Sequence, residues 1–232
     1  MLKGPNNLIT LLLIYILIII PACTVKERRI EHSTPMAVVE ARVFADENYV
    51  KSHSGHFSVG NDWEKTAKKR VMDLSRYFEK EFAIKLEILS LDIWEHGHNV
   101  SDYLPSYARV ARTLLFEDLR GLPLNNSDLI IGISVNDIGG MVEYKGKYML
   151  IGTPGKFRKN KRGGRGLRGR FDCVSDTKYL DRHELGHIFG LDDKDYGPGS
   201  IMKPDSRKTE FNELEKSIIM ENKNERFGIY SK

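Results

Sequence analysis

The spacing of apolar residues along the chain predicts alternating helices and strands. Between Asp62 and Phe82 apolar side chains recur every three or four residues, the period of a helix with one buried face, and Asp is a residue type that caps helix N-termini. Ile84 to Ile93 alternates apolar and polar residues, as a half-buried strand does. Tyr107 to Leu119 is a second helical stretch, and Leu129 to Val135 is an apolar run typical of a strand buried on both faces.

Weaker patterns extend this succession at both ends. Ala37 to Phe44 has enough branched apolar residues for a first strand. Met141 to Tyr144 and Lys147 to Gly152 flank Lys145-Gly146 in the manner of a hairpin. Phe211 to Asn222 has the pattern of a last helix, so residues 37–232 are predicted to form a domain of the α/β class.

Four histidines lie in polar segments between these elements. His53 and His56 fall in a predicted loop, and His96 and His98 fall in the turn after the second predicted strand. Each pair has two interpretations, metal ligands or solvated loop side chains, and the pattern leaves both open.

The first 23 residues resemble an export signal. Leu8 to Ile20 is uncharged and almost wholly apolar, and it is shorter than the segment of about 20 residues that crosses a bilayer. Ile20-Pro21-Ala22-Cys23 resembles the lipobox of bacterial lipoproteins, whose cysteine is acylated and becomes the first residue of the mature chain. The resemblance implies a signal peptide over residues 1–22, a tether over 23–36, and export from the cytoplasm with a lipid anchor at Cys23 in a bacterial membrane, at the outer membrane or cell surface. An uncleaved N-terminal anchor is the alternative.

Composition excludes several classes of protein. The chain has 232 residues, of which 41% are hydrophobic and 29% charged, a balance unlike that of a disordered tail, a fibre or a polytopic membrane protein. Lys and Arg number 36 against 32 Asp and Glu, so the net charge of +4 does not by itself indicate nucleic-acid binding. The 2 cysteines exclude a disulfide framework. Cys173 then has three open roles: a buried structural thiol, a zinc-ligating thiolate, or a disulfide with Cys23.

Residues 156–170 carry 8 basic residues and no acidic one. Such a run has too few apolar side chains to bury, so it is predicted to form a solvated loop. The functional interpretation is capture of an anionic partner. Nucleic acid is not expected, because Phe157 is the only aromatic side chain in the run and single-stranded nucleic acids need several to stack on.

One segment has the spacing of a metal site. His183 and His187 are four residues apart, so on a helix their imidazoles lie on one face and can hold one metal ion. Gly190 can end that helix with a left-handed turn, and the turn carries Asp193 back toward the metal as a third ligand. Asp192 is the competing third ligand, because a shift of the turn by one residue exchanges the two.

The string from His183 to Asp193, His-Glu-x-x-His-x-x-Gly-x-x-Asp, resembles the zinc signature of metzincin metallopeptidases. Its third-position aspartate is similar to that of snapalysin-type enzymes. Ser200 to Pro204 contains Met202 and resembles the Met-turn, a methionine-containing turn that underlies the zinc histidines in that family. The resemblance implies a metzincin-like catalytic domain over residues 37–232: a twisted mixed sheet with an antiparallel edge strand, two packing helices, a zinc-site helix and a small C-terminal subdomain ending in a helix.

We therefore expect a monomeric zinc-dependent endopeptidase that hydrolyses protein or peptide substrates. Glu184 adjoins the first ligand, so it is placed to act as the general base for a water that one catalytic Zn²⁺ ion activates. A carboxylate ligand leaves the metal less positive than a third imidazole would, and we expect an activity optimum at neutral to mildly alkaline pH. The alternative is a non-catalytic surface lipoprotein that binds an anionic partner through residues 156–170 and uses a metal only for folding.

Overall fold

The computed structural model describes residues 36–54, 62–96, 108–134, 139–143, 145–152, 173–203, 206 and 208–227. These residues all belong to one compact unit, Thr34–Lys232. The predicted signal peptide, the predicted lipidation site Cys23 and the basic run 156–170 lie outside the described residues, as do His56 and His98. No helix in the described part of the chain combines the length and the apolar character needed to cross a membrane.

A five-stranded mixed sheet forms the centre of the unit. Its strand order is β2-β1-β3-β5-β4, with every neighbouring pair parallel except β4 and β5, which are antiparallel. The predicted fold class, a mixed sheet with an antiparallel edge strand, is therefore confirmed. The strands are β1 (Ala37–Asp46), β2 (Ile84–Trp94), β3 (Leu129–Ser134), β4 (Gly140–Val142) and β5 (Tyr148–Gly152).

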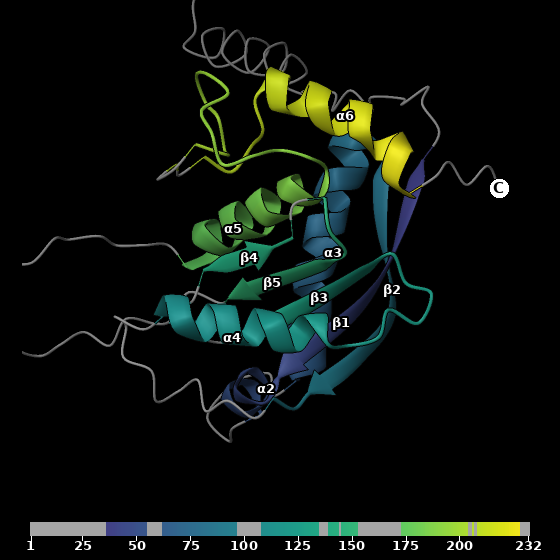
Figure 1. Ribbon diagram of the computed structural model, residues 1–232, viewed down its shortest axis with the longest axis vertical. Helices are drawn as coiled ribbons and strands as arrows, with labels where there is room; N and C mark the ends of the chain where they lie inside the picture. Colours follow the sequence, from purple (N-terminus) through teal and green to yellow (C-terminus); the bar gives the residue numbers. More distant parts are fainter. Residues whose placement is uncertain are drawn as a thin grey trace, which may run out of the picture. The chain divides into compact units, whose positions relative to one another are not determined.

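Two helices cover opposite faces of this sheet (Figure 1). The helix α3 (Trp63–Phe82) packs on one face and α4 (Ala108–Arg120) on the other, each through its own cluster of buried apolar side chains. All six residues of β3 are buried, because helices lie on both of its faces. The largely apolar pattern of Leu129 to Val135 thus predicted that this strand is buried on both faces.

The helix α3 and strand β2 follow the predicted boundaries closely. Asp62 caps α3, since its carboxylate accepts a hydrogen bond from the Lys65 backbone N–H at 2.9 Å. Ala83 ends the helix in a left-handed conformation (φ 52°), and β2 begins at the next residue. The helical and alternating patterns meet at this point in the sequence, so the boundary was predictable.

A short helix, α2 (Glu47–His53), corrects the prediction for His53. Asp46 ends β1 and caps α2, with its carboxylate 2.5 Å from the Tyr49 N–H. His53 lies in the last turn of this helix and stacks on the Tyr49 ring, with centroids 4.2 Å apart, so it is neither a loop residue nor part of a described metal-binding group. Only Tyr49 is buried among the helix residues, and one buried residue gives no helical period to recognise.

His96 is buried rather than solvated. Its Nε2 lies 3.8 Å from a carboxylate oxygen of Asp46, and both side chains are almost completely inaccessible. The metal interpretation of this histidine is not supported, because the described residues contain no group of metal ligands that includes it.

Two further helices complete the unit, α5 (Cys173–Ile188) and α6 (Glu213–Phe227). The Arg70 guanidinium of α3 holds α5 in place, since its Nε donates to the Asp181 carboxylate at 2.8 Å and its Nη2 donates to the Gly152 carbonyl at 2.9 Å. Burial raises the pKa of Asp181 even though Arg70 opposes this shift. The helix α6 begins two residues later than predicted, and its Asn222 donates to the Phe189 carbonyl just past the end of α5.

Candidate metal centre

The end of α5 brings the predicted metal ligands together. His183 and His187 lie one turn apart on this helix, which ends at Ile188. Gly190 adopts φ +90°, a conformation that favours glycine, and an added Cβ atom there would lie 2.8 Å from Asn222 Nδ2. This turn reverses the chain and returns Asp193 to the two imidazoles.

Three ligand atoms converge at this point. The Oδ1 atom of Asp193 lies 3.0 Å from His183 Nε2 and 3.4 Å from His187 Nε2. The two Nε2 atoms are 3.2 Å apart. Asp192, the alternative ligand, instead pairs with Lys194 at 3.6 Å and is not part of this group.

The hydrogen bonds of the two rings indicate why a cation fits between them. His183 Nδ1 lies 3.2 Å from the Ile201 carbonyl and His187 Nδ1 lies 2.6 Å from the Leu191 carbonyl. Carbonyl oxygens only accept, so each Nδ1 carries the proton and each Nε2 presents a lone pair. Burial, with the neighbouring His187 adding to it, lowers the pKa of His183, which favours the neutral ring. Three acceptors this close together repel one another unless a cation lies among them.

The donor set suits zinc. Two imidazole nitrogens and one carboxylate oxygen form a three-residue set that leaves a further position open, as catalytic zinc sites do. The backbone carbonyls that hold both Nδ1 atoms are the outer contacts that fix ligand orientation in such sites. His183, His187 and Asp193 could therefore hold a Zn²⁺ ion, although this chemistry does not separate zinc from other divalent transition metals.

The loop that follows Asp193 packs beneath α5. Met202 is buried, and its sulfur would lie 3.2 Å from a Cβ atom added at Gly186, between the two histidines. The preceding residue supplies the Ile201 carbonyl that orients His183. The segment resembling a Met-turn thus lies directly under the ligand helix.

Glu215 of α6 holds this loop, a feature that the sequence patterns did not reveal. Its buried carboxylate accepts hydrogen bonds from the Ser200 hydroxyl at 2.6 Å and the Met202 N–H at 3.0 Å. It also accepts from the N–H groups of Ile201 at 3.3 Å and Asn212 at 2.8 Å. Four donors would lose their partner if this one carboxylate were removed.

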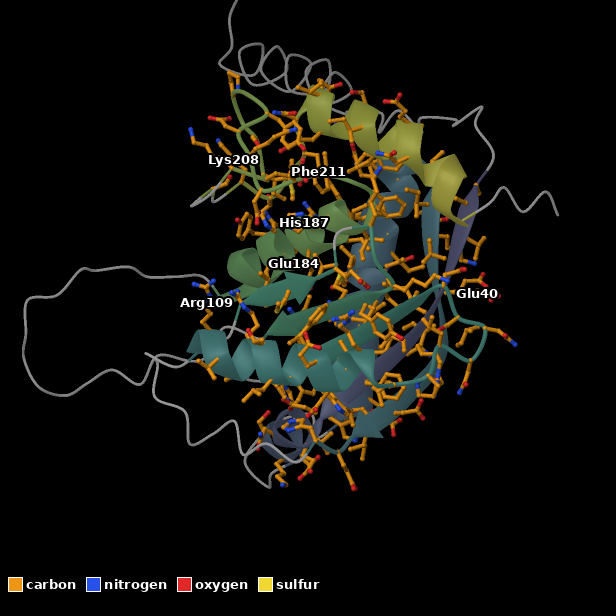
Figure 2. All side chains as sticks on the ribbon, in the orientation of Figure 1. Glu40, Arg109, Glu184, His187, Lys208 and Phe211 are labelled. Carbon is orange, nitrogen blue, oxygen red and sulfur yellow. The ribbon has the colours of Figure 1, made fainter. Side chains whose placement is uncertain are left out.

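Glu184 lies on the side of α5 that faces β4 (Figure 2, which labels Glu184 and His187). It lines a cavity of about 430 Å³ together with the three metal-ligand candidates, Asp192, Arg112 of α4 and the whole of β4. Burial raises the pKa of Glu184 to about 8 in the metal-free protein, the Asp193 charge adds to this effect, and Arg112 opposes it. A bound dication would lower this pKa, because positive charge stabilises the carboxylate.

The absence of a side chain at Gly140 leaves room for the Glu184 carboxyl group. A Cβ atom added at Gly140 would overlap the Glu184 carboxyl group. We predict that Gly140→Ala displaces this carboxyl group and lowers the rate of any reaction that depends on it at least tenfold, while metal content stays at the wild-type level. Metal analysis and activity assays on the same preparation test this expectation, and a variant with unchanged activity would contradict it.

The raised pKa of Glu184 has a consequence for the metal-free protein. Because its folded-state pKa, about 8, exceeds the ordinary value of 4.5, Glu184 stabilises the fold most below pH 4.5 and loses that contribution as the pH rises to 8. In chelator, we expect the unfolding free energy of the wild type to fall by roughly a few kcal/mol between pH 4.5 and pH 8. The Glu184→Gln variant should not show this fall, because its side chain does not ionise. Urea titrations of both proteins at several pH values measure the difference, and parallel pH dependences would refute the prediction.

Comparison with protein-family models finds no match, and comparison with curated protein sequences finds none. Comparison with solved structures finds archaemetzincin from Methanopyrus kandleri, with a TM-score of 0.52, 16% sequence identity, and coverage of 83% of this chain and 98% of that one. A chain from a chaperone–substrate complex covers 83% of this chain and 35% of its own length at 14% identity, but its TM-score of 0.45 is too low to indicate a shared fold. The likeness to archaemetzincin shows that this chain has a metzincin-like fold.

Proposed function

We propose that this chain is a zinc-dependent endopeptidase. The observation that carries the proposal is the convergence of His183 Nε2, His187 Nε2 and Asp193 Oδ1 within 3.4 Å of one another, beside the buried carboxyl group of Glu184. The metzincin-like fold supports it, because the archaemetzincin structure shares this architecture. A chance cluster of surface side chains would not combine three metal-binding atoms with a neighbouring base in one cavity.

Each residue has a role in peptide hydrolysis. His183, His187 and Asp193 would hold the metal, and a bound Zn²⁺ ion supplies Lewis-acid chemistry that polarises a carbonyl and acidifies water. Glu184 takes the proton of the attacking water and passes it to the amine that leaves as the peptide bond breaks.

The strand β4 is the surface on which an extended peptide would lie. It forms an edge of the sheet and lines the same cavity as Glu184. Its outward backbone groups can pair with a peptide as an added strand, which presents a peptide bond to the residues of α5.

The test uses residues 24–232 purified in excess zinc and then dialysed. We expect about one zinc per chain and casein cleavage that a chelator stops and added zinc restores. Stoichiometric zinc without cleavage of casein or of a varied peptide mixture would refute the peptidase proposal, as would cleavage that survives the chelator.

We also propose that the protein is exported and anchored by lipid at Cys23. This proposal rests on the apolar segment and the lipobox-like residues 20–23 of the sequence. Incorporation of labelled palmitate into the full chain, and its loss in Cys23→Ser, is the expected result. A soluble, unlabelled full-length chain would disprove the lipid anchor and leave the peptidase proposal untouched.

A further inference from the structure

The wall of the cavity beside Glu184 contains an arginine side chain, Arg112 of α4. Arg112 is the one Lys or Arg side chain among the described residues that line it. Its Nη1 donates to the Gly140 carbonyl at 3.1 Å. Its Nε is buried and has no hydrogen-bond acceptor in the described part of the chain.

The donors left over by Arg112 indicate the chemistry of its partner. A guanidinium carries five N–H donors in a rigid planar fork; the Gly140 carbonyl accepts from one, and the buried Nε–H has no acceptor among the described residues. A buried donor without a partner destabilises the protein, and a carboxylate matches the fork with two parallel hydrogen bonds. The cavity is large enough, at about 430 Å³, to admit such a group beside the metal ligands.

The position of Arg112 indicates that the carboxylate it would bind belongs to the substrate. Gly140 is the first residue of β4, the strand on which an extended peptide would lie under the proposed function. The guanidinium is therefore fixed at one end of the peptide-binding edge, beside Glu184. A carboxylate there would belong to a residue close to the bond that is cut.

We propose that Arg112 is a specificity-determining residue that binds a carboxylate of the substrate, so that the enzyme prefers acidic peptides. The proposal rests on the peptidase function proposed above. The carboxylate is that of an Asp or Glu side chain or of a peptide C-terminus, two sources with the same chemistry.

Two other roles are open to Arg112, and the experiment must separate them. Its hydrogen bond to Gly140 could serve only to hold β4. Its positive charge also acts on Glu184, where it lowers the carboxyl pKa. Both of these roles would affect every substrate alike, whereas carboxylate binding affects acidic substrates selectively.

The experiment compares fluorogenic peptides that differ at one position, Glu against its isostere Gln, on either side of the cleaved bond. Each peptide is made as a free acid and as a C-terminal amide, which distinguishes the two sources of the carboxylate. Kinetic constants are measured for wild type, Arg112→Gln and Arg109→Gln. Arg109 is an exposed arginine at the beginning of the same helix and does not line the cavity, so its variant is a control for the loss of one positive charge (Figure 2).

We expect wild type to prefer one acidic form by about 10- to 100-fold in kcat/KM, mostly through KM. Arg112→Gln should lose this preference and Arg109→Gln should keep it. Fluorescence anisotropy gives a readout independent of turnover: labelled acidic and neutral peptides binding to Glu184→Gln should differ in Kd by a similar factor, and the double variant with Arg112→Gln should bind them equally.

Three results would overturn the proposal. They are cleavage without any acidic preference, a preference that persists in Arg112→Gln, and an equal loss of kcat for all peptides in that variant. If wild type cuts none of the peptides and no casein, the peptidase function itself is wrong, which is a different outcome from cleavage without preference.

Discussion

Glu184→Gln is expected to lower kcat/KM for peptide hydrolysis by about 100- to 10,000-fold, the usual contribution of a general base. The substitution keeps the shape of the side chain and removes its ability to accept a proton. Because Glu184 is not one of the three converging ligand candidates, zinc content should not change. The measurement is steady-state cleavage of a fluorogenic peptide, paired with metal analysis of the same sample.

Glu213→Gln is the matched control, since the Glu213 side chain is 93% exposed on α6 and Glu213 is not among the described residues that line the cavity. It should retain wild-type rates. Activity of Glu184→Gln within tenfold of wild type would mean that another group accepts the proton. If the protein is instead a non-catalytic lipoprotein that uses a metal only for folding, the wild type itself will show no metal-dependent cleavage.

Glu215→Leu is expected to destabilise the protein by roughly 3–5 kcal/mol. The buried carboxylate satisfies the Ser200 hydroxyl and three backbone N–H groups, and a leucine leaves all four donors without a partner. Zinc should also bind more weakly, because the same loop carries the Ile201 carbonyl that orients His183. Urea denaturation in chelator measures the first effect, and a zinc titration measures the second.

Two variants make the Glu215 test selective. Glu215→Gln keeps one oxygen acceptor and should lose about 1–2 kcal/mol. Glu213→Leu, on the exposed face of α6, should change stability by no more than about 0.5 kcal/mol. A Glu215→Leu protein as stable as Glu213→Leu would show that the carboxylate does not hold the loop.

Most of the sheet and its covering helices could be predicted, because their apolar patterns are long and their boundaries are marked. Asp62 and the left-handed Ala83 bracket α3, and the largely apolar run of β3 indicated burial on both faces. The helix α2 was missed because its stability comes from one cap and one buried ring, Asp46 and Tyr49, which produce no period.

The three candidate ligands could be predicted because they lie close together in the sequence. The residues that support them from other elements could not. The spacing of His183, His187 and Asp193 depends on one helix and one turn. Gly140 and Glu215 reach the same centre from β4 and α6, and sequence spacing contains no information on such distant contacts. Arg112 likewise cannot be told from Arg109 until α4 is packed against β4.

Anomalous diffraction at the zinc absorption edge, from crystals grown with zinc, tests directly whether His183, His187 and Asp193 hold a zinc ion. We expect one strong peak at about 2.0–2.2 Å from His183 Nε2, His187 Nε2 and a carboxylate oxygen of Asp193. Crystals with well-ordered side chains at these three residues and no peak among them, or a peak held by Asp192 instead of Asp193, would contradict it.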